Sequence, residues 1–302
     1  MNYLPSESNF LGITEPELHS YESSKVAIQS APYEHTSSYS SGSEKGPGAI
    51  LEASHYVEFY DEELDQETYR MTGICTLPPM NFEGIFDQAA IDLIEKETHS
   101  HIANDKFVIS LGAEHTVSYG FFRALHKKYP DVSVLQIDAH SDLRAIYQGN
   151  RFSHASVMAR INDHQPLICQ AGIRAQCIEE AALIKTSPNI HTWFSHQIHS
   201  NPGWQNEIVN TLGDKVYITI DADGFDPSVI PNVGTPEPGG LQWFETLDLL
   251  KKVCRQKEVV GFDIVEVAPK PESIISEFTL AKLLYRMLGY LTLNPRFREK
   301  YC

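Results

Sequence analysis

The sequence predicts an α/β protein with three layers (α/β/α), in which a central, mostly parallel sheet lies between two layers of helices. Three observations support this prediction. Runs rich in β-branched residues recur along the chain, and they are almost continuously apolar, as in strands that are covered on both faces. Stretches of helical character lie between these runs, so strand and helix alternate. No Pro/Gly-rich linker divides the alternation, and no internal repeat interrupts it.

The expected elements follow one another along the chain. The strands are KVAIQSAP (25–32), DKFVISLG (105–112), VSVLQIDAH (132–140), PLICQAGIR (166–174), KVYITIDAD (215–223) and EVVGFDIVEV (258–267). Helices are expected at residues 86–104, 117–129, 242–256 and 272–291. Another helix should begin at Gly46-Pro47, because proline suits the first turn of a helix.

The 302 residues are expected to form one domain over residues 25–302, with residues 1–24 as an N-terminal arm or tail. The net charge of −16 argues against nucleic acid or an anionic membrane as a partner, since phosphate binding needs clustered Lys and Arg. No apolar run approaches 20 residues, and the N-terminus lacks the features of a secretory signal. Five cysteines without a CxxC motif indicate reduced thiols in a cytoplasm.

Polar clusters follow three of the expected strands. Ligands of open α/β sheets gather beyond the carboxyl ends of the strands, so these clusters are candidate site residues. The clusters contain Glu114 and His115 in SLGAEHTVS, Asp138, His140 and Asp142 in LQIDAHSDLR, and Asp221 and Asp223 in ITIDADGFDP.

The spacing of these residues indicates a metal site. Side chains at i, i+2 and i+4 of an extended segment share one face, so each cluster can project its groups together. Four buried carboxylates would repel one another strongly, and two divalent cations would offset that charge. Carboxylate and imidazole ligands without thiolate favour Mn²⁺ over Zn²⁺, with Fe, Co and Ni as alternatives. Any single pair could instead cap a helix or a turn, but three such clusters at strand ends favour the metal interpretation.

GAEH, DAHSD and IDADGFDP resemble the three metal-binding signatures of the ureohydrolase family, which includes arginase, agmatinase and formiminoglutamase. The resemblance extends through GTPEPGGL (234–241), GFDIVEVAP (261–269) and the upstream segment at 32–54, and so covers about residues 25–290. It implies the arginase-like fold and a centre of two Mn²⁺ ions per chain, which hydrolyses a guanidinium group to urea and an amine. In this scheme Asp138 and Asp221 bridge the ions, His115 and Asp142 complete one ion, and His140 and Asp223 complete the other. Asp226 is not a ligand and is expected to fix the loop.

The mechanism implied by the resemblance is attack of a metal-bridging hydroxide on the guanidinium carbon. His154, in NRFSHASVM, matches the proton-shuttling histidine of the family, although a surface histidine near a helix N-terminus is the alternative. Glu266, in FDIVEVAP, matches the carboxylate that holds the guanidinium, with a strand-end salt bridge as the alternative. Asp263 is expected to be a structural strand residue.

The substrate is predicted to be agmatine, which would give urea and putrescine. The stretch YQGNRFSHAS departs from the loop Ser-Gly-Asn-x-His-Gly of arginases, and the chain is more similar to agmatinases. GAEH in place of the commoner Gly-Gly-Asp/Glu-His, and KPESIISEFTLAK after VEVAP, are departures from the agmatinase pattern. The alternatives are aminopropylagmatine, guanidinobutyrate, guanidine or arginine as substrate, a dinuclear phosphoesterase, or a non-catalytic metal-binding member. The family further implies a homo-oligomer, either a trimer or a hexamer.

Overall fold

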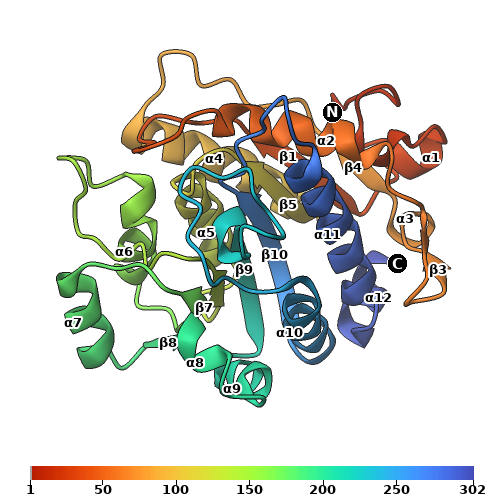
Figure 1. Cartoon of the computed structure of the whole chain (residues 1–302). Coiled ribbons are helices and arrows are strands. Elements are labelled where there is room, and N and C mark those ends of the chain that lie inside the picture. Colours follow the sequence, from red (N-terminus) through yellow and green to blue (C-terminus); the bar gives the residue numbers. More distant parts are fainter. Residues whose placement is uncertain (1) are drawn as a thin grey trace.

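The computed structural model describes residues 2–302, and its centre is a sheet of eight strands that all pair in parallel (Figure 1). The strand order across the sheet is β4-β1-β5-β10-β9-β6-β7-β8. The strands are β1 (Val26–Ala31), β4 (Ile74–Thr76), β5 (Phe107–Gly112), β6 (Ser133–Ile137), β7 (Ile168–Ile173), β8 (Ile190–Phe194), β9 (Lys215–Asp221) and β10 (Glu258–Val265). A separate antiparallel pair consists of β2 (Tyr60–Asp61) and β3 (Gln66–Glu67).

The predicted three-layer architecture is confirmed, and each of the six expected strands is present. The sequence did not predict β4 and β8, which are the two edges of the sheet. β4 has only three residues, and β8 (IHTWF) is partly exposed over most of its length. Neither strand therefore shows the long apolar run that is typical of a central parallel strand.

Helices cover both faces of the sheet (Figure 1). They are α1 (Pro16–His19), α2 (Gly46–Ser54), α3 (Tyr69–Thr72), α4 (Asp87–Ala103), α5 (Val117–Lys128), α6 (Val157–Asn162), α7 (Ile178–Thr186), α8 (Ser195–Ile198), α9 (Trp204–Thr211), α10 (Trp243–Gln256), α11 (Ile275–Leu291) and α12 (Pro295–Tyr301). Single 3₁₀ turns are η1 (Phe10–Gly12), η2 (Ser43–Lys45), η3 (His154–Ser156) and η4 (Ala222–Gly224). As expected, α2 begins at Gly46-Pro47, with the proline in its first turn.

Two apolar cores lie on the two faces of the sheet. Along β9, Ile218 and Ile220 belong to the core beneath α2, α10 and α11, whereas Tyr217 belongs to the core beneath α4 and α5. Because side chains of a strand alternate between faces, a strand buried on both sides must be apolar at nearly every position. This explains the unbroken apolar runs in the sequence.

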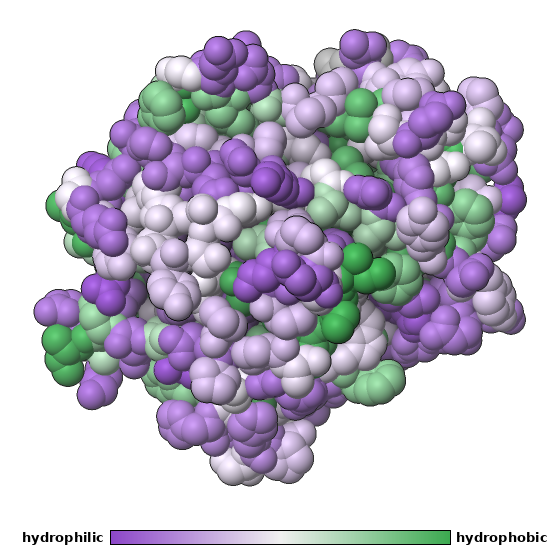
Figure 2. Space-filling model, turned by 45° about the horizontal axis from the view of Figure 1, so that its top comes forward, coloured by the Kyte–Doolittle hydropathy of each residue, from purple (hydrophilic) through white to green (hydrophobic). Residues whose placement is uncertain are grey.

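The N-terminal segment contacts the sheet and its helices. Phe10 and Ile13 are fully buried in the core that contains α11, and the backbone N–H of Leu4 donates to the carbonyl of Thr76 on β4 (2.8 Å). No helix within residues 2–302 combines the length and apolarity needed to cross a membrane. On the face shown in Figure 2, hydrophilic residues dominate and hydrophobic ones gather in a few small patches.

The topology places the predicted site at the middle of the sheet. β5, β10, β9 and β6 are consecutive neighbours, and the segments that follow them carry the polar clusters. In the register between β6 and β9, Ile137 pairs with Ile220, so Asp138 and Asp221 leave the sheet side by side. The strand order thus brings together clusters that are far apart in the sequence.

Candidate metal centre

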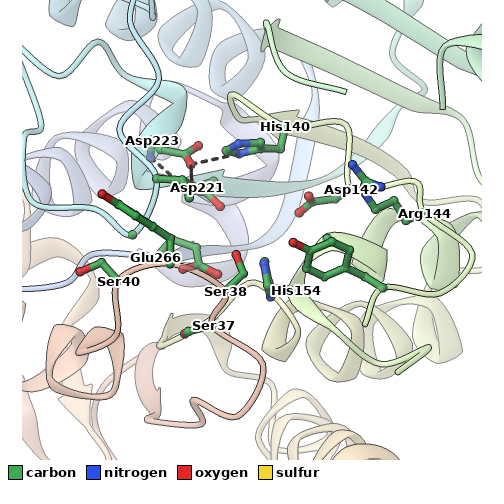
Figure 3. A pocket seen from close by; sticks show the side chains of 15 residues that line it. Ser37, Ser38, Ser40, His140, Asp142, Arg144, His154, Asp221, Asp223 and Glu266 are labelled. Atoms are coloured by element: carbon green, nitrogen blue, oxygen red, sulfur yellow. Dashed lines mark hydrogen bonds and ion pairs between the residues drawn. The ribbon is translucent and has the colours of Figure 1, made fainter. Parts of the chain in front are cut away.

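A cavity of about 190 Å³ lies beyond the carboxyl ends of these strands (Figure 3). Of the eight predicted site residues, six line it and two, His115 and Asp138, lie buried just behind them. The six are His140, Asp142, His154, Asp221, Asp223 and Glu266. In Figure 3, His140, Asp221 and Asp223 lie on one side of the cavity, and His154 approaches from the other side beside Ser38.

His115 is at the centre of the first group of candidate ligands. Its Nδ1 atom is buried and has no hydrogen-bond partner, yet it lies 2.9 Å from Asp142 Oδ2, 3.1 Å from Asp138 Oδ2 and 3.3 Å from Asp221 Oδ2. Ligand atoms about 2.1 Å from one ion, at right angles to each other, are about 3 Å apart. The spacing and the unpartnered nitrogen therefore fit a cation between these side chains.

Asp138 also belongs to a second group. Its Oδ1 lies 3.7 Å from His140 Nδ1, which is itself 3.1 Å from Asp223 Oδ2. The two oxygens of Asp138 thus face different groups, as expected for a carboxylate that bridges two ions. Asp221 is held next to this group, because its Oδ1 accepts the backbone N–H of Asp223 (3.0 Å).

The pKa values of the cluster indicate that its carboxylates need nearby positive charge to be ionised. Burial, followed by the charges of Asp223 and Asp138, raises the pKa of the Asp221 carboxyl well above its usual range. Burial and Asp138 likewise raise the pKa of Asp142. Two divalent cations would offset this repulsion, and the mixed oxygen and imidazole donors suit Mn²⁺ or a similar first-row ion.

Two of the site residues have a left-handed backbone. Asp142 has φ of 53° and Glu266 has φ of 66°. Aspartate tolerates this region, but glutamate rarely adopts it, and such strain is commonly found at functional sites. At Glu266 the turn ends β10, and the side chain reaches the loop after the neighbouring strand β5, where Oε1 accepts the backbone N–H of His115 (2.7 Å). Burial raises the pKa of Glu266 despite this hydrogen bond.

A chain of hydrogen bonds fixes the ring of His115 from behind. His115 Nε2 lies 2.9 Å from the hydroxyl of Thr219, which donates to Asp263 Oδ1 (2.7 Å), and the hydroxyl of Tyr217 donates to the other oxygen of Asp263. An outer carboxylate of this kind orients a ligating histidine and sets its tautomer. Asp263 is therefore part of the surroundings of the site as well as of the strand. The sequence contained one indication of these hydrogen bonds, because Tyr217, Thr219 and Asp221 alternate along β9 and so share one face of the strand.

His154 lines the cavity from the first residue of η3. Its ring Nδ1 lies 3.0 Å from the hydroxyl of Thr36, in the loop after β1. Burial, followed by the charges of His115 and His140, lowers the pKa of His154 to about 4. Glu114 was identified from the sequence only as a member of a polar cluster, and its partner Thr36 was not assigned a role, because the loop after β1 has no motif that points toward His154.

Asp226 has the loop-fixing contacts expected from the sequence. Its Oδ1 accepts from the backbone N–H and the hydroxyl of Ser228 (3.0 and 2.6 Å), and its Oδ2 accepts from the backbone N–H groups of Gly239 (2.9 Å) and Gly240 (3.1 Å). These bonds join the loop after β9 to the segment before α10. They leave Asp226 outside the two groups of candidate ligands.

Comparisons with known proteins agree with this geometry. The sequence profile of the Arginase family matches residues 24–289. N(1)-aminopropylagmatine ureohydrolase of Synechocystis sp. is 40% identical over 277 residues, which are 90% of each chain. Agmatinase of Bacillus cereus is 35% identical over 258 residues, which are 83% of this chain and 86% of the relative.

Solved structures give the same result. The crystal structure of agmatine ureohydrolase of Thermoplasma volcanium aligns with a TM-score of 0.80 and 31% identity, and the alignment covers 91% of this chain and 92% of the other. The family match spans most of the sequence, including every segment that carries a candidate ligand. This chain therefore belongs to the arginase family of ureohydrolases.

Proposed function

We propose that this protein binds two Mn²⁺ ions and hydrolyses the guanidinium group of a linear guanidino amine to urea and a free amine. One observation carries the proposal: two groups of candidate ligands share Asp138, and the cavity above them also contains Glu266 and His154. The proposed ligands are His115, Asp138, Asp142 and Asp221 for one ion and Asp138, His140, Asp221 and Asp223 for the other. Their donor types and spacing fit this assignment.

The bound cations would supply an acidified water and offset negative charge that develops at the guanidinium carbon. Glu266 would hold the substrate, because a carboxylate can accept parallel N–H bonds from a planar guanidinium. Glu266 Oε1 already accepts one backbone bond, and this bond fixes the side chain before the substrate arrives. Such preorganisation avoids the entropy cost of ordering the side chain during the reaction.

His154 would move the proton that hydrolysis requires. Addition of water to the guanidinium carbon releases a proton, and the departing amine must take one up as the C–N bond breaks. A neutral imidazole on the cavity wall can accept the first and deliver the second. The lowered pKa of His154 is consistent with a ring that is neutral when the substrate binds.

Two substrates with the same agmatine core are candidates. Agmatine is the substrate predicted from the sequence motifs. The second candidate, N1-aminopropylagmatine, is favoured by the names of three relatives that are 35–40% identical over about 90% of the chain. At the cavity wall, Arg144 lies over the ring of Tyr147 (5.2 Å) and 3.9 Å from Glu180, and this pairing moderates its repulsion of a cationic tail. We place N1-aminopropylagmatine first and agmatine second.

The test is urea release by Mn²⁺-loaded protein from agmatine, N1-aminopropylagmatine, guanidinobutyrate, arginine and guanidine. We expect the two agmatine-core compounds to have the highest kcat/KM, with N1-aminopropylagmatine ahead. A preference for guanidinobutyrate, whose tail is anionic, would overturn the substrate assignment. Absence of urea from every compound would overturn the enzymatic proposal.

Metal content separates the enzyme from a non-catalytic family member. We expect two Mn²⁺ equivalents per chain by elemental analysis after loading and gel filtration. One equivalent or none would favour the non-catalytic alternative. The Glu266→Gln variant is a suitable control, because it should bind both ions and yet lose turnover.

The proposed setting is a cytoplasmic homo-oligomer, either a trimer or a hexamer. The free cysteines Cys75, Cys169 and Cys254 are buried as thiols, which is consistent with a reducing compartment. Phe244, Ile274 and Ile275 are large apolar residues with exposed side chains, as in subunit contacts. Light scattering coupled to gel filtration would measure the assembly, and a monomeric mass would contradict it.

A further inference from the structure

The hydroxyl of Thr36 lies between a buried carboxylate and the ring of His154. Thr36 Oγ1 is 3.1 Å from Glu114 Oε1 and 3.0 Å from His154 Nδ1, and it accepts the backbone N–H of His154 at 3.0 Å. Glu114 is fully buried, in the short loop between β5 and α5. Three segments that are remote in the sequence thus meet at one hydroxyl group.

The hydrogens around Thr36 can be assigned one by one. As a carboxylate, Glu114 accepts at both oxygens: Oε2 accepts the backbone N–H groups of His35 (2.9 Å) and Thr36 (2.6 Å), and Oε1 accepts from the hydroxyl of Thr36. The single hydrogen of the Thr36 hydroxyl is directed to Glu114 Oε1. Oγ1 is then left with lone pairs only, and it uses one of them for the backbone N–H of His154.

The remaining contact, between Thr36 Oγ1 and His154 Nδ1, therefore needs its hydrogen on the ring. We propose that Glu114 and Thr36 are positioning residues that hold His154 as the Nδ1–H tautomer, with the lone pair of Nε2 free for the cavity. This inference deepens the proposed function and rests on it for its catalytic consequence. A histidine in the opposite tautomer would present N–H to the cavity and could not take a proton from the attacking water.

Glu114→Gln is the sharpest test, because it should reverse the tautomer without a change in shape. The two backbone N–H groups require the oxygen of the new amide, so its NH₂ must face Thr36 and donate to Oγ1. The Thr36 hydrogen then turns to His154 Nδ1, and the ring proton moves to Nε2. We expect kcat to fall about 10- to 100-fold, with KM within about threefold, as for other outer-shell substitutions.

The direct readout is the ¹⁵N chemical shift of the two ring nitrogens of His154. It is measured in the full-length protein loaded with diamagnetic Zn²⁺, and the signals are assigned by their loss in His154→Asn. We expect protonated Nδ1 in the parent and protonated Nε2 in Glu114→Gln. Protonated Nε2 in the parent, or the same tautomer in both proteins, would overturn the inference. This readout does not depend on turnover, so it remains decisive even if no guanidine proves to be a substrate.

A second pair of variants separates positioning from packing. Thr36→Ser keeps the hydroxyl, and its kcat should stay within about threefold of the parent. Thr36→Val keeps the shape but lacks the hydroxyl, and its kcat should fall by about 10- to 100-fold. The matched control is Thr98→Val, the same change at a buried threonine of α4 that bonds Gln29 of β1 and does not line the cavity. If Thr98→Val lost as much activity as Thr36→Val at equal metal content, the loss would reflect general destabilisation, and the inference would fail.

Discussion

Asp142→Asn should stabilise the metal-free protein and reduce the additional stability that metal confers. Oxygens of Asp142 and Asp138 and Nδ1 of His115 all lie within 4.8 Å of one another. Asparagine has the same shape as aspartate and tolerates the left-handed backbone of position 142 (φ 53°). The substitution therefore removes a charge with little strain, which makes it cleaner than a change to alanine.

The expected change in the free energy of unfolding follows from the separation of these atoms. Two unit charges no more than 4.8 Å apart repel by about 3 kcal/mol or more at an effective dielectric constant of about 20. Burial and Asp138 raise the pKa of Asp142 even though His115 lies beside it, so the ionised carboxylate is unfavourable in the folded protein without metal. The metal-free variant should therefore need about 3 kcal/mol more to unfold at pH 8. With Mn²⁺, the lost ligand should weaken binding by about 100-fold or more, which lowers the metal-induced stabilisation by about 3 kcal/mol.

The assay is urea unfolding at pH 8, in EDTA and in saturating Mn²⁺. The control is Asp226→Asn, which also removes a carboxylate but loosens a loop outside the candidate ligand groups. The control should lose stability equally in both buffers and keep the full Mn²⁺ effect. The reasoning would be refuted if Asp142→Asn were less stable than the parent in EDTA and kept the full Mn²⁺ effect. That result would mean that His115 and Asp142 form a structural ion pair and not a metal site.

Three further predictions concern other residues. His154→Asn should lower kcat by about 10²- to 10⁴-fold while two Mn²⁺ remain bound, and a decrease below tenfold would exclude proton transfer by this ring. Glu266→Gln should reduce kcat/KM by about 100-fold, since it replaces a charge-assisted contact worth about 1.5–3 kcal/mol per bond; an unchanged value would exclude contact with the guanidinium. Nδ1 of His101 lies 3.0 Å from the hydroxyl of Tyr21, and burial lowers the pKa of His101 to about 4 from an ordinary 6.5. The unfolded chain therefore takes up the proton first as the pH falls, and stability is lost between about pH 6.5 and 4. In urea unfolding with EDTA, His101→Gln should remove about 2 kcal/mol of the decrease between pH 7.5 and 5, and an equal decrease in both proteins would contradict the assignment.

The central strands and the convergence of the predicted site residues could be predicted because both leave local patterns. Long apolar runs are required of strands with two covered faces, and the polar residues just past them must lie at the carboxyl edge. Asp138 and Asp221 were identified for this reason. The edge strands β4 and β8 are short and half-covered, so their residues carry no comparable pattern.

The residues that position the site residues were less predictable, because their contacts depend on which strands are neighbours. Asp263 was expected to serve only the strand, yet the pairing of β10 with β9 places it opposite Thr219, within reach of the His115 ring. Thr36 contacts His154 through a loop that has no regular structure. Such contacts follow from strand order and loop path, and neither is encoded by the spacing of residues along the chain.

The strand order also has a consequence for how the protein folds. Glu266 and His115 are hydrogen-bonded although 151 residues separate them, and β10 inserts between β5 and β9 after both have been synthesised. A nascent chain that lacks β10 thus has a gap in the middle of its sheet, and contacts of such high sequence separation form slowly. Cations in the proposed site would bind only the completed sheet, and they would therefore stabilise contacts that are expected to form after the folding transition state. Mn²⁺ should therefore slow unfolding in stopped-flow measurements and leave the refolding rate unchanged.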